Sequence, residues 1–294
     1  YWTIVLDLAA GLPPQFKAAY HGSNGKKSRI PDKETCDQVL KDISENAFKV
    51  ASVDRRKVQR RPSAPFITST LQQEAARRYR FPAQKSMRVA QSLYEGKDVG
   101  IADTHGLITY MRTDSPRISK EAQAQARQFI QEQYGPDFVP GKPPQYQARK
   151  SAQEAHEAIR PTNVTLTPDR VKSYLTADEF KLYTMIWERF VASQMAPAIV
   201  NVTTIKVGAG PDGKHEFRAT GSEVVFEGHY KITGLPTETK KSTKTQDSDD
   251  SDATTSLRNQ QLPTVADNEI LDCKKVAPNQ NFTKPPARFS EATL

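Results

Sequence analysis

Hydrophobic residues alternate with polar or small residues near both ends of the chain, which is typical of half-buried β-strands. Near the N-terminus this alternation predicts two strands, at residues 1–8 and 16–21, which the Gly11–Pro14 turn joins. A helix is expected over residues 31–45, where apolar residues recur three and four positions apart, and residues 48–53 return to a strand. The first part of the chain is therefore expected to be mainly β structure.

The centre of the chain has a helical period instead. Four helices are expected, over residues 65–80, 85–95, 118–135 and 167–192. Two helices followed by the apolar run Leu107–Tyr110 form the element order of a small winged-helix-like unit. The aromatic residues of the last helix, such as Tyr183 and Trp187, are expected in a core.

After Pro197 the chain returns to short strand-like runs. They are expected at residues 200–207, 216–220, 224–226, 230–232 and 270–276. The helical block is thus predicted to be inserted into an antiparallel β domain, which gives an α+β fold. The predicted domains are residues 1–65 and 197–276 for the two parts of the β domain, 66–196 for the mainly helical domain, and 277–294 for the start of a following domain.

Residues 237–256 are expected to be disordered, because they contain Ser, Thr, Lys and Asp with almost no apolar residue. They include an acidic run, Asp247–Asp252. No predicted helix or strand would position its carboxylates, and neither a glycine nor a glutamate completes a calcium loop. We therefore expect no metal ion to bind there.

The composition favours a polyanionic partner such as nucleic acid. The 294 residues include 42 Lys and Arg against 34 Asp and Glu, which gives a net charge of +8, and the mean hydropathy is −0.67. The two cysteines, Cys36 and Cys273, lack the spacing of a zinc site, so a reducing cytoplasm is expected. The sequence has neither a signal-peptide pattern nor an apolar run near the ~18 residues that a membrane helix needs.

Reactive side chains are concentrated in one stretch, residues 106–115. Its candidate residues are Tyr110, Arg112, Thr113, Asp114 and Ser115. We expect Tyr110 to be a nucleophile directed at a phosphodiester. A tyrosine phenol has a pKa of about 10, so deprotonation at neutral pH costs roughly 4 kcal/mol, and a nearby cation lowers that cost. Arg112 can hold two phosphate oxygens, and Asp114 could orient Arg112 or take part in proton transfer.

Three other segments are candidates for binding. His156, Glu157 and Arg160 lie within five residues, and His156 and Arg160 would face one side if that turn is helical. The predicted N-terminus of the helix over residues 65–80 carries Thr68, Ser69, Thr70 and Gln72. These groups either cap that helix or bind an anion. Residues 55–61 carry five positive charges, and they form either a solvated edge strand or a phosphate contact.

Four phrases resemble bacterial DNA topoisomerase I, a type IA enzyme. They are PFITSTLQQEA at residues 65–75, GLITYMRTDS at 106–115, QEAHEAIRP at 153–161 and FTKPPARFS at 282–290. The resemblance implies that Tyr110 attacks one DNA strand, forms a 5′-phosphotyrosyl link and reseals it after strand passage, which relaxes negative supercoils without ATP. It also implies that Arg112 and His156 line the catalytic site on single-stranded DNA. The helical block would be a movable catalytic gate, and the β domain an arch around a DNA-sized hole.

The family's N-terminal Toprim domain and C-terminal zinc ribbons have no counterpart in this sequence. The chain also begins and ends inside predicted elements, so we expect a fragment of a monomeric, nucleoid-associated enzyme. Mg²⁺ would bind to the Toprim domain rather than to this chain, and the fragment alone would not relax supercoiled DNA. Two alternatives stay open: a non-catalytic module in which Tyr110 stacks on a base of single-stranded DNA, or the equivalent part of a topoisomerase III or reverse gyrase.

Overall fold

The computed structural model describes residues 1–100, 106–146, 156–235, 260–283, 285 and 288–291. The chain divides into two compact units. The sheet unit consists of Tyr1–Gln59, Ile199–Phe226 and Pro236–Pro286, and the helical unit consists of Arg60–Ala198, Glu227–Leu235 and Ala287–Leu294. Each unit has its own cluster of buried apolar side chains.

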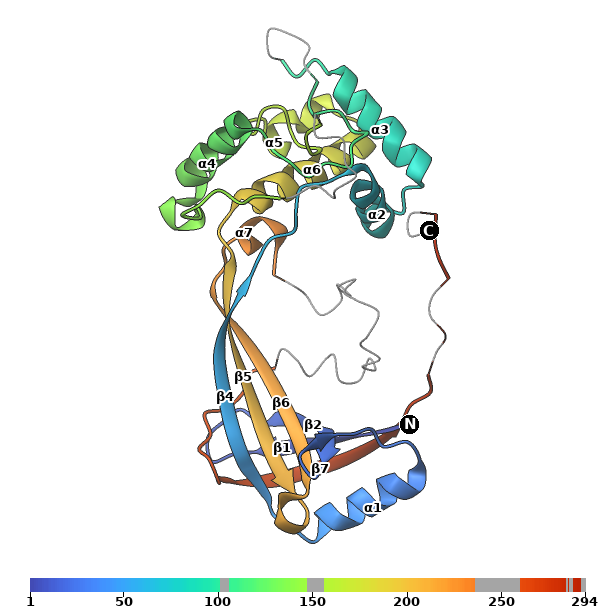
Figure 1. Cartoon of the computed structure of the whole chain (residues 1–294), viewed down its shortest axis with the longest axis vertical. Coiled ribbons are helices and arrows are strands. Elements are labelled where there is room, and N and C mark those ends of the chain that lie inside the picture. Colours follow the sequence, from blue (N-terminus) through green and yellow to red (C-terminus); the bar gives the residue numbers. More distant parts are fainter. Residues whose placement is uncertain (101–105, 147–155, 236–259, 284, 286–287, 292–294) are drawn as a thin grey trace. The chain divides into compact units, whose positions relative to one another are not determined.

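The sheet unit is built on a seven-stranded sheet (Figure 1). Its strands are β1 (Trp2–Ala9), β2 (Phe16–Ser23), β3 (Lys26–Lys27), β4 (Phe48–Arg60), β5 (Ala198–Ala209), β6 (His215–Phe226) and β7 (Ile270–Gln280). The strand order is β1-β7-β4-β5-β6-β2-β3, and each register that the structure describes is antiparallel. Because β1 also pairs with β2, the sheet closes into a ring, and β3 extends the end of β2.

The core of the sheet unit follows from the alternation seen in the sequence. Ile4, Leu6 and Leu8 of β1 are fully buried, since residues two apart share one face of a strand. Helix α1 (Lys33–Ser44) packs its buried residues into the same cluster, and the Asp32 carboxylate caps it by accepting from the Thr35 amide at 2.8 Å. The amphipathic pattern thus decides which side of α1 faces the core.

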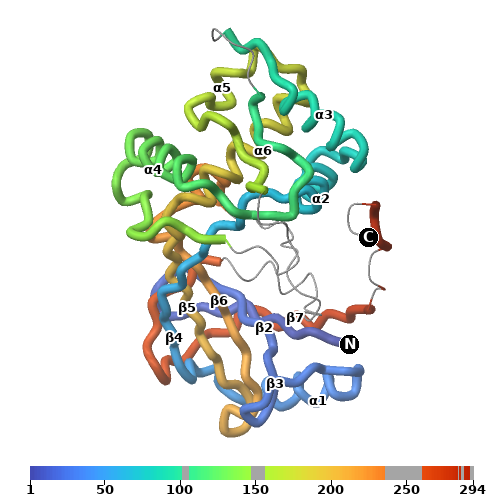
Figure 2. Tube along the Cα trace, turned by 45° about the horizontal axis from the view of Figure 1, so that its top comes forward, coloured from blue at the N-terminus to red at the C-terminus, as the bar shows by residue number. Residues whose placement is uncertain are grey.

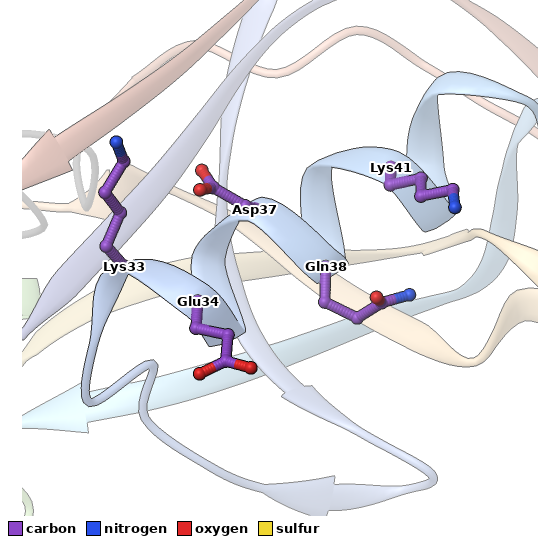
Figure 3. A pocket seen from close by; sticks show the side chains of 5 residues that line it. All are labelled: Lys33, Glu34, Asp37, Gln38 and Lys41. Atoms are coloured by element: carbon purple, nitrogen blue, oxygen red, sulfur yellow. The ribbon is translucent and has the colours of Figure 1, made fainter.

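The other side of α1 lines an open pocket of about 530 Å³ (Figure 3). Its lining residues are Lys33, Glu34, Asp37, Gln38 and Lys41. All of them belong to one helix, and they include charges of both signs. This is the ordinary solvated face of an amphipathic helix, so the pocket does not indicate a binding site.

The helical unit packs around one long helix. Its helices are α2 (Thr68–Tyr79), α3 (Ala83–Glu95), α4 (Lys120–Tyr134), α5 (Pro168–Val171), α6 (Ala177–Gln194) and α7 (Tyr230–Thr233), with 3₁₀ turns η1 (Pro136–Phe138) and η2 (Lys172–Tyr174). Helix α6 contacts α3, α4, α5 and α7 (Figure 2). Its Tyr183, Ile186 and Phe190 are buried, as expected for the aromatic residues of this segment.

The predicted mixture of helices and antiparallel strands, an α+β fold, is confirmed. The winged-helix detail is not, because the Leu107–Tyr110 run forms an isolated bridge from Ile108 to Pro161 rather than a strand. Residues 237–256 lie outside the described residues, so the expected disorder stays a prediction.

Four of the predicted elements were wrong. The single helix over residues 167–192 is divided into α5, η2 and α6, because Thr176 and Glu179 form a capping box that starts a new helix. The two strands expected within residues 216–226 are one strand, β6. Residues 230–232 belong to helix α7 rather than to a strand, between two glycines with positive φ, Gly228 and Gly234.

The basic segment 55–61 continues β4 as far as Arg60. The register of β4 with β7 covers Phe48 and Lys49, and the basic side chains beyond it are exposed. The basic side chains are solvated as expected, but β4 is not an edge strand, because it lies between β7 and β5 in the strand order. The phosphate contact stays a prediction.

Candidate active site

The stretch around Tyr110 is held in place by backbone hydrogen bonds to residues 156–162. The Thr109 amide donates to the Arg160 carbonyl at 2.9 Å, and the Thr162 amide donates to the Leu107 carbonyl at 3.0 Å. The described residues from His156 to Arg160 form no helical turn, so the condition under which His156 and Arg160 would face one side is not met. Two stretches that lie about 50 residues apart in the sequence are thereby fixed side by side.

The N-terminus of α2 joins the same assembly. The Ile159 amide donates to the Phe66 carbonyl at 2.8 Å, and the Thr68 amide donates to the Thr113 carbonyl at 2.9 Å. In return the Thr113 amide donates to the Thr68 hydroxyl at 2.9 Å. The phrases at residues 65–75 and 106–115 and the described part of the phrase at 153–161 therefore meet within the helical unit.

The end of α3 fixes the start of the Tyr110 stretch. The Leu107 amide donates to the Leu93 carbonyl at 2.8 Å. Gly106 approaches the backbone of α3 so closely that a Cβ there would collide with the carbonyl oxygen of Tyr94, which explains the need for glycine. Leu107, Ile108 and Met111 are buried beyond this point.

Tyr110 itself points away from that core. Its side chain is 42% exposed, although the neighbouring apolar residues are buried. Its ring has two aromatic neighbours: the Tyr94 ring at 5.5 Å with an edge-to-face angle of 67°, and the His156 ring at 6.2 Å with an angle of 56°. The phenol expected to be a nucleophile is therefore accessible and stands beside the predicted histidine.

A cavity of about 570 Å³ opens beside these rings. It is lined by Ile67, Thr68, Ser69, Gln72, Arg112, Thr113, Asp114 and His156. Seven of these eight residues are candidates from the sequence, and they come from α2 and from the segments at Arg112 and His156. The cavity thus collects polar groups of both predicted kinds, the reactive stretch and the helix N-terminus.

Several of the predicted binding residues support the local backbone. The Thr68 hydroxyl donates to the Met111 carbonyl at 2.8 Å, and the Thr70 hydroxyl accepts from the Ile67 amide at 3.0 Å. Ser115 is fully buried, and its amide donates to the Thr113 hydroxyl at 3.1 Å. These four hydroxyl residues therefore shape the site, and their predicted contact with substrate is left to experiment.

Glu157 and Arg160 pair with each other. Arg160 donates from Nε and Nη2 to Oε2 of Glu157 at 2.9 and 2.6 Å, and its Nη1 donates to the Pro161 carbonyl at 3.0 Å. These contacts occupy three of the five guanidinium donors. The pair stiffens the segment that carries His156.

Arg112 and Asp114 behave differently. Both are exposed, and among the residues that the structure describes neither has a hydrogen bond or ion pair, with each other or with any other group. The expected role of Asp114 in orienting Arg112 is therefore not seen in this arrangement. Arg112 instead presents its guanidinium at the cavity, where an anionic ligand could satisfy it.

The described part of the chain contains no group of three or more His, Cys, Asp or Glu residues that could hold a metal ion. Its helices also include none that is long and apolar enough to cross a membrane. The donor set beside Tyr110, with one carboxylate and one imidazole, does not fit Mg²⁺.

Comparison with known proteins decides the family. A family model described as DNA topoisomerase matches residues 1–294. The chain belongs to this family. It is similar to the DNA topoisomerase 1 of Rickettsia felis and of Rickettsia prowazekii, with 41% identity over 299 residues in each case, and to that of Rickettsia typhi with 40%.

A solved structure supports the same assignment. The chain resembles the full-length topoisomerase I from Thermotoga maritima with a TM-score of 0.73 and 31% identity, over 99% of this chain and 42% of that one. The Rickettsia alignments cover all of this chain but 36% of each relative. This topoisomerase chain therefore spans about a third of the length of the curated relatives that it matches.

The sequence did not indicate the role of one residue in this topoisomerase chain, Tyr94. Its helical spacing with Met87 and Ala90 predicts a position on the apolar face of α3. In the structure the Tyr94 side chain is 40% exposed and lies against the Tyr110 ring. No spacing rule connects positions 94 and 110, because helical periodicity relates only residues within one helix and Tyr110 lies beyond the end of α3.

The end of α3 is anchored by a buried carboxylate. Glu179 of α6 accepts from the Ser92 hydroxyl at 2.7 Å and lies 2.6 Å from Nζ of Lys97. Burial alone would raise the pKa of Glu179, but hydrogen bonds from Lys97, from the Thr176 backbone and from Ser92 outweigh it and lower that pKa to about 2. The carboxylate stays charged and holds α3 against α6.

Proposed function

We propose that this chain is the part of a type IA DNA topoisomerase that carries the nucleophile, and that the nucleophile is Tyr110. The observation that carries the proposal is the exposed phenol whose ring neighbours that of His156. His156 lines a cavity together with Arg112, whose guanidinium has no partner among the described residues. Membership of the DNA topoisomerase family supports it. Single-stranded DNA is the proposed substrate.

The proposed reaction exchanges one phosphoester for another. The Tyr110 oxygen forms a bond to phosphorus, the bond from phosphorus to the 3′ oxygen breaks, and the 3′ oxygen leaves as a hydroxyl while DNA stays attached through a 5′-phosphotyrosyl link. The reverse attack by the 3′ hydroxyl reseals the strand. Because each bond broken is replaced by a similar one, the cycle needs no ATP.

Arg112 and His156 have distinct proposed tasks. The guanidinium fork of Arg112 would hold two phosphate oxygens and stabilise the additional negative charge of the transition state. His156, whose ring neighbours that of Tyr110, would hydrogen-bond the phosphate or the substrate. Ser69 and Gln72 at the start of α2 would contact the DNA backbone, because the amides of a helix N-terminus favour anions.

We also propose that this chain acts together with further domains. It spans 36% of the length of the Rickettsia relatives, and its described residues offer no ligand set for Mg²⁺. A Toprim domain would supply the metal site, and no step above depends on it. Residues 1–294 alone are expected not to relax negatively supercoiled plasmid in the presence of Mg²⁺, and relaxation by them would contradict this part of the proposal.

Substitution of Tyr110 tests the proposal. The assay uses the intact protein, meaning residues 1–294 with any segments encoded on either side, and an end-labelled single-stranded oligonucleotide. After denaturation, wild type should retain label covalently and Tyr110→Phe should retain none, while both bind the DNA. Tyr174→Phe is the matched control, since Tyr174 is 48% exposed in the same unit and, among the described residues, its ring does not contact that of His156 as the Tyr110 ring does.

The two failures have different meanings. Covalent capture by Tyr110→Phe would assign the nucleophile to another residue. Binding without covalent capture in wild type would favour the non-catalytic module in which Tyr110 stacks on a base.

A further inference from the structure

Among the described residues, the ring of Tyr94 is the nearest aromatic group to the proposed nucleophile. Its centroid lies 5.5 Å from that of Tyr110, and the planes meet at 67°, which is the favourable edge-to-face geometry. The two side chains are exposed to similar extents, 40% and 42%. The contact therefore lies at the surface, where packing alone does not hold a side chain in one rotamer.

An exposed tyrosine normally samples several staggered rotamers. A nucleophile gains from restriction, because the attacking oxygen must lie near phosphorus and in line with the leaving oxygen. Tyr110 is on an irregular segment without a helix or strand of its own. Its orientation must come from neighbouring groups, and the Tyr94 ring is one of the two aromatic groups in contact with it.

Tyr94 is well placed for this task because its own position is rigid. It belongs to the last turn of α3, and the preceding residue, Leu93, accepts the hydrogen bond from the Leu107 amide. The ion pair between Lys97 and Glu179 anchors the same end of the helix to α6. Gly106 brings the Tyr110 stretch directly against the Tyr94 backbone.

We infer that Tyr94 is a positioning residue for Tyr110: its ring holds the phenol in the orientation from which it attacks the phosphodiester. This inference rests on the proposed function. It requires an aromatic ring at position 94, and it does not require the Tyr94 hydroxyl. It also requires that Tyr94 act on the rate of cleavage and not on the affinity for DNA.

The test compares Tyr94→Leu and Tyr94→Phe in the intact protein. Leucine removes the ring but keeps the side chain apolar and has a high helix propensity, and phenylalanine keeps the ring. Single-turnover formation of the covalent adduct gives the cleavage rate, and fluorescence anisotropy with the same oligonucleotide, on a Tyr110→Phe background, gives the affinity. Tyr174→Leu is the control, because it removes an equally exposed tyrosine of the same unit that has no contact with Tyr110 in the described structure.

We expect Tyr94→Leu to slow cleavage about fivefold, which corresponds to ~1 kcal/mol, with unchanged affinity. Tyr94→Phe should cleave at the wild-type rate, and Tyr174→Leu should also match wild type. A cleavage rate of Tyr94→Leu equal to that of wild type would overturn the inference. A loss of affinity for the oligonucleotide that accounts for the whole reduction would also overturn it, because it would indicate that the Tyr94 ring stacks on DNA.

A folding defect and a failure of the proposed function can each be distinguished from a failure of the role inferred for Tyr94. If Tyr94→Leu loses stability in a thermal melt, Tyr94→Gln, which also suits an exposed helix position, provides the second measurement, and the same fivefold reduction is expected. If wild type forms no adduct, the proposed function fails. If wild type forms an adduct at Tyr110 and neither variant slows it, only the role of Tyr94 fails.

Discussion

Two clusters in this chain contain the residue types of a catalytic site, and they are built in opposite ways. In the sheet unit, Oγ of Ser23 lies 2.8 Å from Nδ1 of His215, and Oδ2 of Asp42 lies 2.9 Å from Nε2 of the same ring. Serine, histidine and aspartate in series form the usual set for nucleophilic catalysis. In the helical unit, Tyr110, Arg112 and His156 have no such mutual hydrogen bonds within the described structure.

The cluster in the sheet unit is closed. His215 is 2% exposed, and the carboxylate of Asp42 also accepts from Lys214 at 2.8 Å and Gln38 at 2.7 Å. Hydrogen bonds from Lys214, His215 and Gln38 hold the pKa of Asp42 far below its usual range. These contacts tie the ends of β2 and α1 to the start of β6, so the cluster is structural.

The cluster in the helical unit is open instead. Tyr110 and Arg112 are exposed, Arg112 and half-buried His156 line a cavity, and the described residues leave the Arg112 guanidinium available to a ligand. The comparison teaches that residue type alone does not identify an active site. An active site is identified by polar side chains whose hydrogen-bonding groups the fold leaves without partners, next to a cavity large enough for substrate.

The largest expected effect concerns the open cluster. Arg112→Ala in the intact protein should slow covalent adduct formation by about 100-fold, because a charge-stabilising donor at the transition state is lost. Arg112→Lys should be intermediate, since it keeps the charge and loses the fork. Single-turnover cleavage measures both.

Arg88→Ala is the matched control for this substitution. Arg88 is exposed on α3 of the same unit and does not line the cavity. A similar loss of rate in this variant would mean that general positive charge, not the position of Arg112, matters.

The closed cluster should respond in stability and not in rate. His215→Leu removes the buried ring that joins Ser23 to Asp42, and we expect a loss of about 1–3 kcal/mol in the free energy of unfolding. Urea titration measures it, and the cleavage rate per folded molecule should stay at the wild-type value. A rate loss without a stability loss would show that this cluster is catalytic after all.

A third cluster consists of Glu179, Ser92 and Lys97. It is closed, like that of the sheet unit, but it lies in the same unit as Tyr110 and therefore extends the comparison. The folded-state pKa of Glu179, about 2, is below its ordinary value of 4.5. Its charge therefore stabilises the fold above pH 4.5, and this stabilisation is lost as the pH falls from about 4.5 toward 2. We expect the free energy of unfolding of wild type to exceed that of Glu179→Gln by roughly 2 kcal/mol at pH 7. The difference should become progressively smaller below pH 4.5.

Thermal melts of both proteins between pH 7 and pH 3 measure this difference. A gap between the two melting temperatures that does not change with pH would contradict the role assigned to the charge of Glu179.

Much of the fold could be predicted because its signals are local. The apolar spacing in α1, α3 and α4, and the alternation in β1, depend on neighbouring residues only. The break before α6 has a local signal, the Thr176–Glu179 capping box, whereas another error arose where tertiary contacts override local pattern. Residues 230–232 look like a strand, but the His229 amide bonds to the Ala196 carbonyl after a turn at Gly228, and the segment becomes helical.

The candidate site was predicted as a set of residues and not as an arrangement. The cluster of reactive types at residues 106–115 is visible in the sequence, whereas its closeness to His156 depends on hydrogen bonds such as that from Thr109 to Arg160. The contact of Tyr94 with Tyr110 depends on where α3 ends. No local pattern carries that information, and the same is true of the division between open and closed clusters.

The central claim, that the open cluster contains the nucleophile, is tested most directly by locating the DNA adduct. The intact protein is incubated with single-stranded DNA, denatured, and digested with nuclease and trypsin, and the modified peptide is identified by mass spectrometry. Trypsin releases residues 98–112 as one peptide, in which Tyr110 is the sole tyrosine. The account predicts a nucleotide linked to Tyr110 in that peptide, and a nucleotide on Ser23 or on any other side chain would contradict it.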